Sequence, residues 1–115
     1  MRAVRQKRGT RMIARTWSGR TKRDHAEAYL KVVLETGLTD IPQTPGNQGA
    51  WLLRREDGDE AEFFLISLWD SFESIRAFAG PDVNKARYYP EDDAYLLEKA
   101  EKVVHYEVVH GLNSD

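Results

Sequence analysis

Hydrophobic and polar residues alternate with two different periods along this chain, and each change of period marks the start of a new element. Apolar side chains recur at every second position in four segments, which is the period of a half-buried strand. Between these segments the apolar spacing becomes three or four residues, which is typical of an amphipathic helix. The predicted strands cover residues 12–17, 50–55, 61–70 and 102–110, and the predicted helices are centred on residues 26–34 and 72–79.

Both predicted helices are flanked by residues that commonly begin or end a helix. We expect Thr21 to be the N-cap of the first helix and Gly37 to take the left-handed position after its end. Asp70 is expected to cap the start of the second helix, and Gly80, which is followed by proline, is expected to end it. Residues 38–50 contain two prolines and two glycines and are predicted to be a loop.

The order of these elements predicts the fold. Asp57-Gly58 lies between the second and third predicted strands and is typical of a tight antiparallel hairpin. Pro90 and the three acidic residues after it favour the start of a short helix before the last strand. The resulting β-α-β-β-α-β order predicts an α+β, ferredoxin-like domain, in which helices cover one face of a four-stranded antiparallel sheet.

The third predicted strand is apolar on both of its faces. Phe63, Leu65 and Trp69 alternate with Phe64 and Ile66 along it. Helices can cover only one face of such a sheet, and a large exposed apolar patch favours association or aggregation. We therefore expect a homodimer in which the sheets of two copies pack face to face.

Charge is distributed unevenly and divides the chain into two parts. Residues 1–11 carry five basic side chains and no acidic one, whereas residues 12–115 contain all 19 acidic side chains. We predict a basic, disordered leader over residues 1–11 and a single domain over residues 12–115. The acidic domain argues against a general nucleic-acid binder. The alternative is a weak contact of the leader with nucleic acid or a membrane surface.

Composition and motifs exclude several classes of site. The chain has no cysteine, which excludes disulfides, iron–sulfur clusters and thiol nucleophiles. Its three histidines are far apart in the sequence, so we predict no metal site. No motif for a nucleotide cofactor or a serine hydrolase is present. No apolar run approaches the roughly 18 residues of a membrane span, and the lack of cysteine fits a cytoplasmic protein.

Three segments resemble the antibiotic biosynthesis monooxygenase family of the dimeric α/β-barrel superfamily. They are LISLWDSFESIRAFAGPD, YYPEDDAYLLE and VVHYEVV, and the first contains a W-x-S-x-x-x-I-x-x-F pattern from Trp69 to Phe78. The resemblance runs from about Met12 to His110. It implies that two ferredoxin-like subunits join their sheets into a barrel, with a cavity between the sheet and the helices of each subunit. It also implies, for some members, oxygenation of an electron-rich aromatic substrate such as a quinol without a cofactor.

A haem-degrading branch of the same family is similar to this chain at only one of its motif positions. That branch combines an asparagine on the first strand, a tryptophan and a histidine in the following helix. The chain keeps Trp69, but its first strand offers Arg15, Thr16 and Trp17, and no histidine lies near Phe78. We therefore expect no haem and no other cofactor.

Trp69 and His105 are the candidate catalytic residues. The indole of Trp69 either borders a cavity and meets a ligand, or packs in the core. His105 lies on the last predicted strand, where it can take a proton from a phenol or hydroquinone. The alternative for His105 is a half-buried structural histidine, bonded to the backbone or to an acid such as Asp93.

Five further residues are candidates for binding the substrate. Arg15 shares a face of the first strand with Trp17 and either holds an anionic intermediate or forms a structural ion pair with Glu107. The tyrosines either line a cavity or cap the core with their hydroxyl groups in water. The candidate substrate-binding residues are Trp17, Arg15, Tyr29, Phe78 and Tyr89.

Residues and resemblance together give one leading hypothesis for function and one alternative. The leading hypothesis is a cofactor-independent monooxygenase that acts on a small aromatic or polyketide-like molecule. The alternative is a dimer of the same fold that binds a small ligand without catalysis or is purely structural. Neither hypothesis includes nucleic acid or a membrane as a partner.

Overall fold

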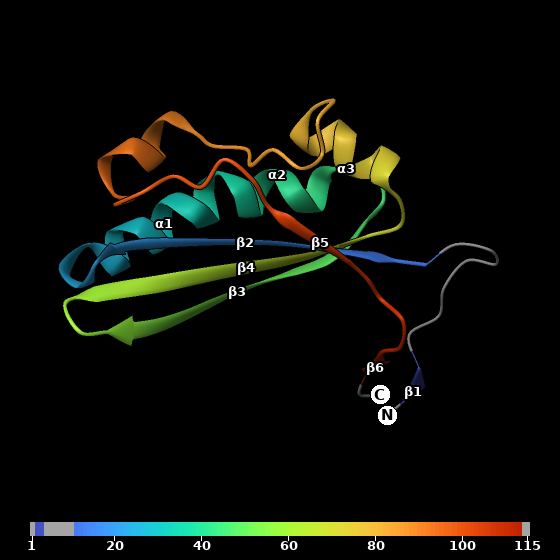
Figure 1. Ribbon diagram of the computed structural model, residues 1–115, viewed down its shortest axis with the longest axis horizontal. Helices are drawn as coiled ribbons and strands as arrows, with labels where there is room; N and C mark the ends of the chain where they lie inside the picture. Colours follow the sequence, from blue (N-terminus) through green and yellow to red (C-terminus); the bar gives the residue numbers. More distant parts are fainter. Residues whose placement is uncertain (1, 4–10, 114–115) are drawn as a thin grey trace.

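The computed structural model describes residues 2–3 and 11–113. Its main feature is a four-stranded antiparallel sheet in the order β3-β4-β2-β5, with helices on one face (Figure 1). This confirms the predicted α+β, ferredoxin-like class. The sheet strands are β2 (Ile13–Lys22), β3 (Asn47–Asp57), β4 (Glu60–Trp69) and β5 (Val104–Glu107). The α-helices are α1 (Ala26–Glu35), α2 (Gly37–Gln43) and α3 (Phe72–Ala79), and the 3-10 helices are η1 (Arg23–His25) and η2 (Pro90–Ala94).

A separate two-stranded sheet joins the two ends of the described chain. Its strands are β1 (Arg2–Ala3) and β6 (Leu112–Asn113), and they pair in antiparallel fashion. Residues 1 and 4–10 of the predicted leader lie outside the described residues. The disordered leader therefore stays a prediction.

The core lies between the helix-facing side of the sheet and the helices, in two clusters. One cluster centres on Tyr29 and Phe63, and the other on Trp69, Ile75 and Phe78. Burying each such large apolar side chain contributes about 1.5–3 kcal/mol to stability. The alternation along β4 produces this arrangement, because every second side chain of the strand faces the helices.

The first helix does not have the predicted ends. Thr21 is not a cap but a fully buried residue near the end of β2, because the alternating pattern continues through small polar residues. Gly37 does not take a left-handed conformation, and it begins α2 instead. The break falls at Thr36, whose hydroxyl donates to the carbonyl of Val32. The predicted loop over residues 38–50 thus contains a helix, which forms because it buries Ile41.

The start of α3 is shifted by one residue from the prediction. Ser71 is the N-cap, and its hydroxyl accepts a hydrogen bond from the backbone N–H of Ser74. Asp70 instead accepts hydrogen bonds from the Ser71 and Ser74 hydroxyls. The helix ends at Gly80, as predicted, where φ is 101°. The last strand is shorter than the predicted 102–110.

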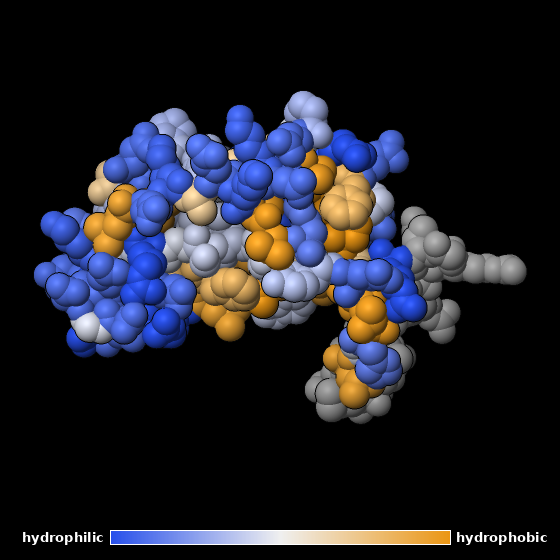
Figure 2. Space-filling view, viewed as in Figure 1, coloured by the Kyte–Doolittle hydropathy of each residue, from blue (hydrophilic) through white to orange (hydrophobic). Residues whose placement is uncertain are grey.

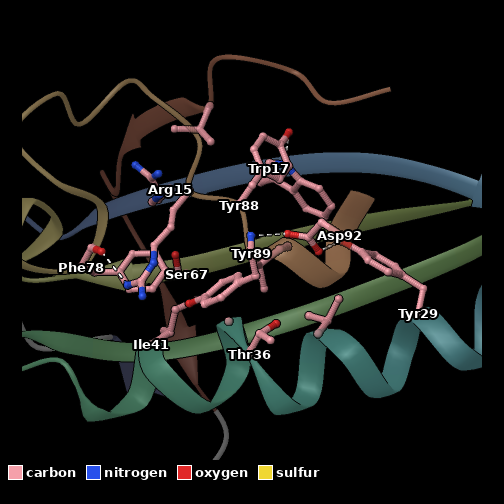
Figure 3. Close-up of a pocket in the computed structure, with 15 residues that line it drawn as sticks. Arg15, Trp17, Tyr29, Thr36, Ile41, Ser67, Phe78, Tyr88, Tyr89 and Asp92 are labelled. Atoms are coloured by element: carbon pink, nitrogen blue, oxygen red, sulfur yellow. Dashed lines mark hydrogen bonds between the residues drawn. The ribbon is translucent and has the colours of Figure 1, made fainter. Parts of the chain in front are cut away.

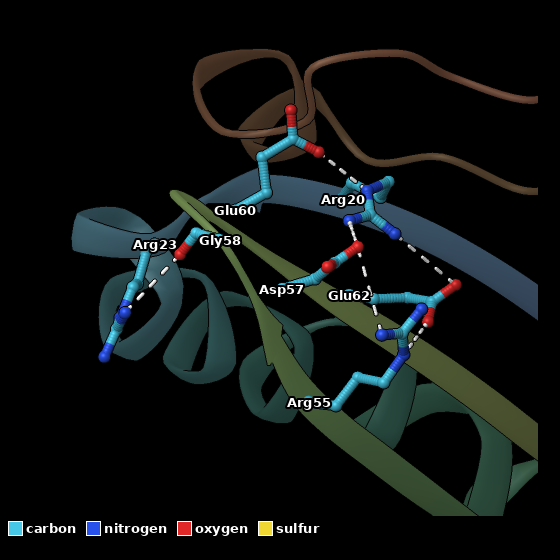
Figure 4. A network of polar contacts seen from close by, with 7 residues as sticks. All are labelled: Arg20, Arg23, Arg55, Asp57, Gly58, Glu60 and Glu62. Atoms are coloured by element: carbon cyan, nitrogen blue, oxygen red, sulfur yellow. Dashed lines mark hydrogen bonds and ion pairs between the residues drawn. The ribbon is translucent and has the colours of Figure 1, made fainter.

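Strands β3 and β4 form the predicted hairpin, and Gly58 in its turn has φ of 63°. Arg20 of β2 reaches the end of this hairpin and bonds Asp57 at 2.6 Å and Glu60 at 2.7 Å (Figure 4). Arg55 bonds Glu62 at 2.6 Å in the same network (Figure 4). Such surface pairs add little to stability, because solvent screens them. They neutralise the acidic residues at this end of the sheet.

The sheet face away from the helices carries exposed apolar side chains (Figure 2). Trp51 and Tyr106 on this face are 54% and 58% exposed. The strand register places Trp51, Ile66, Thr16 and Val104 in one row across the four strands, and three of these four residues are apolar. This is the face predicted to pack against a second copy, and the homodimer stays a prediction.

Candidate functional site

A small pocket lies between the sheet and the helices and is closed on its third side by the segment from Arg87 to Asp92. Its volume is about 60 Å³, which is room for about two water molecules. Polar groups gather at its two ends, with Arg15 and Ser67 at one and Tyr29 and Asp92 at the other (Figure 3). Aromatic side chains form much of the wall between these ends.

The strand register places three polar residues in one row on the helix-facing side of the sheet. Arg15 of β2 is directly paired with Ser67 of β4 on one side and with His105 of β5 on the other. Directly paired residues of antiparallel strands point to the same face. Arg15 and Ser67 line the pocket.

Arg15 is 5% exposed and makes three hydrogen bonds within the chain. Its Nη1 donates to the carbonyl of Val83 at 2.6 Å and lies 3.1 Å from Nε2 of His105. Its Nη2 donates to the carbonyl of Lys85 at 2.9 Å. Burial lowers the pKa of the guanidinium to about 10, so Arg15 remains a cation at neutral pH. These contacts hold the irregular segment after α3 against the edge of the sheet.

The predicted ion pair between Arg15 and Glu107 is wrong. The register pairs Glu107 with Ile13, one row away from Arg15. Ile13 is two residues before Arg15 on the same face of the sheet, so Glu107 lies beside Ile13 and not beside Arg15. Glu107 instead forms a 2.7 Å ion pair with Arg11 at the surface.

His105 is half-buried and does not line the pocket. An arginine N–H can only donate, so Nε2 of His105 accepts from Arg15 and its ring proton lies on Nδ1. Burial and the charge of Arg15 lower the pKa of His105, which keeps the ring neutral at pH 7. The edge of its ring contacts Phe72. His105 is thus half-buried, as in the structural alternative, but its partner is Arg15, and Asp93 pairs with Lys99 instead. Its role as a base stays a prediction.

Trp69 is fully buried and does not line the pocket. Its ring packs on Phe78, with the ring centres 5.7 Å apart, and its Nε1–H donates to the Ser67 hydroxyl at 2.8 Å. The interpretation of Trp69 as a residue that borders the cavity does not match this placement. The strand ends one row beyond Ser67, and it is the serine that reaches the pocket.

The five predicted substrate-binding residues all come together in the pocket wall, although their role in binding a substrate stays a prediction. The hydroxyl of Tyr29 donates to Asp92 at 3.0 Å, and burial raises its pKa above the usual range. The indole N–H of Trp17 donates to the hydroxyl of Tyr88 at 3.1 Å. The five residues are Trp17, Arg15, Tyr29, Phe78 and Tyr89.

Sequence reasoning missed the role of Asp92. It interpreted the three acids after Pro90 only as partners of a helix dipole, but Asp92 is buried in the pocket wall. Its two oxygens accept from the Tyr29 hydroxyl and from the backbone N–H of Tyr89, the latter at 2.7 Å. Only a three-dimensional contact between α1 and η2 distinguishes Asp92 from its exposed neighbours.

A polar latch, consisting of Asp40, Arg87 and Tyr89, joins α2 to the segment over the pocket. Asp40 accepts from the Tyr89 hydroxyl at 2.7 Å and from Nη2 of Arg87 at 3.2 Å. The Arg87 guanidinium stacks on the rings of Phe78 and Tyr89 at 4.8 and 4.9 Å. Burial, and to a lesser degree the hydrogen bond to Asp40, raises the pKa of Tyr89 above the usual range. The tyrosines around the pocket are thus hydrogen-bond donors and not phenolates.

Residues within the described ranges do not bring together three or more histidine, aspartate or glutamate side chains that could hold a metal ion. None of the helices in those ranges has the length and apolar character needed to span a bilayer.

The pocket side chains do not fit haem. Haem iron is held by histidine, cysteine, methionine or tyrosine, and no histidine is present in the pocket wall. The hydroxyls of Tyr29, Tyr88 and Tyr89 already donate to Asp92, Ala100 and Asp40.

Known proteins resemble this chain in structure and not in sequence. No family model matches the sequence, and no curated protein matches it. A Nitrosomonas europaea protein described as a "Putative antibiotic biosynthesis monooxygenase" has a similar structure, with a TM-score of 0.65 and 19% identity over 90% of this chain and 95% of that chain. A Bacillus cereus protein with the same description has a TM-score of 0.61 and 14% identity over 90% and 99% of the two chains.

The structure is also similar to a heme-degrading protein from Mycobacterium tuberculosis. That similarity has a TM-score of 0.59 and 18% identity over 92% of this chain and 100% of the other. At identities this low the comparisons concern the fold alone. The chain has the fold of the antibiotic biosynthesis monooxygenase-like proteins, as its sequence motifs indicated.

Proposed function

We propose that this protein is a cofactor-independent monooxygenase that binds a small aromatic molecule in the pocket between its sheet and its helices. The observation that carries the proposal is the composition of the pocket wall. Trp17, Phe78, Tyr88 and Tyr89 supply aromatic surface, and Arg15 supplies a buried positive charge at one end. An apolar pocket with a few polar groups is the usual form of a small-molecule site.

The pocket has to widen before it can hold an aromatic ring. An engineered cavity that binds benzene has about 150 Å³, whereas this pocket has about 60 Å³. The polar latch is the part of the wall that can move, because Arg87 and Asp40 are partly exposed. Displacing Tyr89 and Arg87 from Asp40 breaks two hydrogen bonds and widens the space between α2 and the segment over the pocket.

The proposed reaction begins with loss of a proton from a phenol or hydroquinone. The anion gives one electron to O2, and the organic radical and superoxide then combine to form a C–O bond. Cleavage of the O–O bond, with loss of water that carries away the hydrogen of that carbon, leaves a carbonyl. One oxygen atom enters the product and the other leaves as water, so no external reductant is required.

Two side chains have roles in the proposed reaction. Arg15 stabilises the anion electrostatically, because a charge fixed in a buried site acts more strongly than one in water. His105 is the candidate base, but its Nε2 already accepts a hydrogen bond from Arg15. Its Nε2 has to leave the contact with Arg15 before it can accept a proton.

Oxygen consumption tests the proposal. We expect a panel of small hydroquinones to consume oxygen faster with the protein than without it, in the presence of a chelator and without added flavin. Arg15→Met should remove this increase, because it removes the charge from the pocket. Arg54→Met, at a surface ion pair with Glu27, is the control and should keep it. Oxygen consumption no faster than spontaneous oxidation with every compound would contradict the proposal.

The second candidate function is ligand binding without catalysis, or a purely structural role. The small volume of the pocket and the hydrogen bonds that close it favour this candidate. Aromatic compounds that raise the melting temperature without any oxygen consumption would establish binding alone. If none of the compounds binds or reacts, the purely structural role is supported.

A further inference from the structure

The geometry points to a carboxylate on the molecule that the pocket binds, held by the side chain of Arg15 and by the hydroxyl of Ser67. The inference rests on the proposed function in one respect, namely that the rest of the ligand is aromatic. It deepens that function by naming the class of ligand as an aromatic carboxylic acid whose reacting hydroxyl is next to the carboxylate, so that both groups lie at the Arg15 end of the pocket.

Arg15 is a buried cation that lacks a carboxylate partner within the described part of the chain. Its side chain bonds only two backbone carbonyls and the neutral ring of His105. Burying a charge is expensive unless an opposite charge accompanies it. The lowered pKa of Arg15 has burial as its cause, with no compensating contribution from an acid. An anion that enters the pocket would supply the missing charge.

The unused donors of Arg15 form one edge of its guanidinium. Nη1 uses its two N–H groups on Val83 and on His105, and Nη2 uses one on Lys85. The N–H of Nε and the second N–H of Nη2 have no acceptor among the described residues. The Nε–Nη2 edge of a guanidinium can bind both oxygens of a carboxylate, and Lys85 takes only one of the two Nη2 hydrogens.

Ser67 adds a third donor next to this edge. Ser67 is directly paired with Arg15 across the strands, and its side chain lines the same pocket. Its Oγ accepts from Nε1 of Trp69 at 2.8 Å, and its own hydroxyl proton has no acceptor within the described ranges. The serine is almost fully buried and faces the pocket, so a partner for this proton has to lie within the pocket. The proton is therefore available to a ligand oxygen.

Trp69 is a positioning residue in this arrangement. Its indole N–H occupies a lone pair of the Ser67 oxygen and so directs the serine proton away from Trp69. Trp69 itself does not reach the pocket. The tryptophan of the sequence motif thus acts on the ligand through the serine two residues before it.

The opposite end of the pocket fixes the direction of the ligand. Asp92 lies there, with its oxygens bonded to the Tyr29 hydroxyl and the Tyr89 backbone. A carboxylate near Asp92 would face a like charge, whereas a carboxylate near Arg15 meets an opposite one. The aromatic part of the ligand then lies along Trp17 and Phe78, between the two ends.

Two matched pairs of probes test the inference on the whole protein: benzoate against benzamide, and acetate against acetamide. Each amide has the shape of its anion but not the charge. We expect both anions to shift the NMR resonance of the Arg15 Nε–H group in a saturable way and both amides to leave it in place. This measurement on the unchanged protein needs no variant to fold.

Variants then identify the donors by titration calorimetry with benzoate. Arg15→Lys keeps the charge but loses the parallel edge, and should weaken binding at least about tenfold. Ser67→Ala should weaken benzoate binding severalfold. Trp69→Phe should also weaken benzoate binding, but by less than Ser67→Ala does. The Arg54→Lys control should bind as the original protein does.

The outcomes separate this inference from the proposed function. Binding of both anions without oxygen consumption supports the carboxylate site and contradicts the monooxygenase. A shift with acetate but not with benzoate supports the site and contradicts the aromatic ligand. Equal binding of anions and amides, or an Arg15→Lys variant that binds benzoate normally, overturns the inference.

Discussion

Arg15 organises the polar end of the pocket. It lies in the central part of the sheet, between Ser67 on one neighbouring strand and His105 on the other. Its hydrogen bonds to Val83 and Lys85 tie the irregular segment after α3 to the sheet. The same side chain therefore shapes the pocket and supplies its charge.

The lowered pKa of His105 predicts a specific loss of stability in acid. At pH values above its ordinary pKa of 6.5 the ring is neutral in both the folded and the unfolded chain. As the pH falls below this value the unfolded chain takes up the proton first, so stability is lost as the pH falls through the lower pKa of the folded state. His105→Gln keeps an acceptor for Arg15 but cannot be protonated.

We expect the free energy of unfolding to fall less in the His105→Gln variant than in the original protein as the pH is lowered below 6.5. Urea unfolding at several pH values measures the difference. His25→Gln, at the start of α1, is a control that should follow the original protein. Identical pH dependence with and without His105 would contradict the contact between His105 and Arg15.

Trp69 is predicted to contribute to stability through its ring and to the pocket through its N–H group. Trp69→Ala should lower the free energy of unfolding by about 3–5 kcal/mol, because it empties a fully buried site. Trp69→Phe keeps most of the ring contacts and should cost about 1–2 kcal/mol, in part for the lost hydrogen bond to Ser67. Denaturant unfolding measures both changes. If Trp69→Ala lowered the free energy of unfolding by less than Trp69→Phe does, the ring would not be packed in the core.

The sequence predicted several residues of the pocket wall but missed two of its polar residues. Trp17 and Arg15 were predicted because strand alternation places them on one face, and Phe78 because of its helix spacing. Ser67 and Asp92 were missed, because a serine within an apolar strand and one acid among three give no signal without the contacts of Trp69 and Tyr29. For Asp92 the deciding partner, Tyr29, is 63 residues away in the sequence.

At the scale of elements, periodicity predicted the strands and helices, whereas local caps were less reliable. The β4 strand follows the alternation closely, because one of its faces is buried by the helices. The α2 helix was missed because Pro42 and its neighbours have turn-like composition. Burial of Ile41 against the core outweighs that local preference.

The N-cap of α3 can be assigned by substitution. Ser71→Ala should lower the free energy of unfolding by about 1 kcal/mol, because the N–H of Ser74 loses its acceptor. Ser71→Thr keeps the acceptor oxygen and is the matched control. Thermal or urea unfolding measures both variants, and equal stability of Ser71→Ala and the original protein would remove Ser71 as the cap.

At the scale of the whole molecule, the exposed face of the sheet is the surface that needs a partner. It carries Trp51, Leu53, Phe64, Val104 and Tyr106 as exposed apolar residues. A second copy packed on this face would close the two sheets into the barrel that the sequence resemblance implies. The pocket lies on the opposite face, so dimer formation leaves it free to open.

Sedimentation equilibrium tests the dimer. We expect the original protein to be a dimer at micromolar concentration and Trp51→Glu to be a monomer, because a charge would be buried at the centre of the interface. Leu34→Glu places the same charge at an exposed leucine on the helix side and should remain a dimer. A monomeric original protein, or a Trp51→Glu variant that still forms the dimer, would contradict the packing of sheet on sheet.

A crystal structure of the protein soaked with benzoate tests the carboxylate site most directly. We expect the carboxylate against Nε and Nη2 of Arg15, the ring beside Trp17 and Phe78, and the Tyr89 hydroxyl released from Asp40. A pocket that stays closed, with benzoate elsewhere or not bound at all, would contradict this expectation.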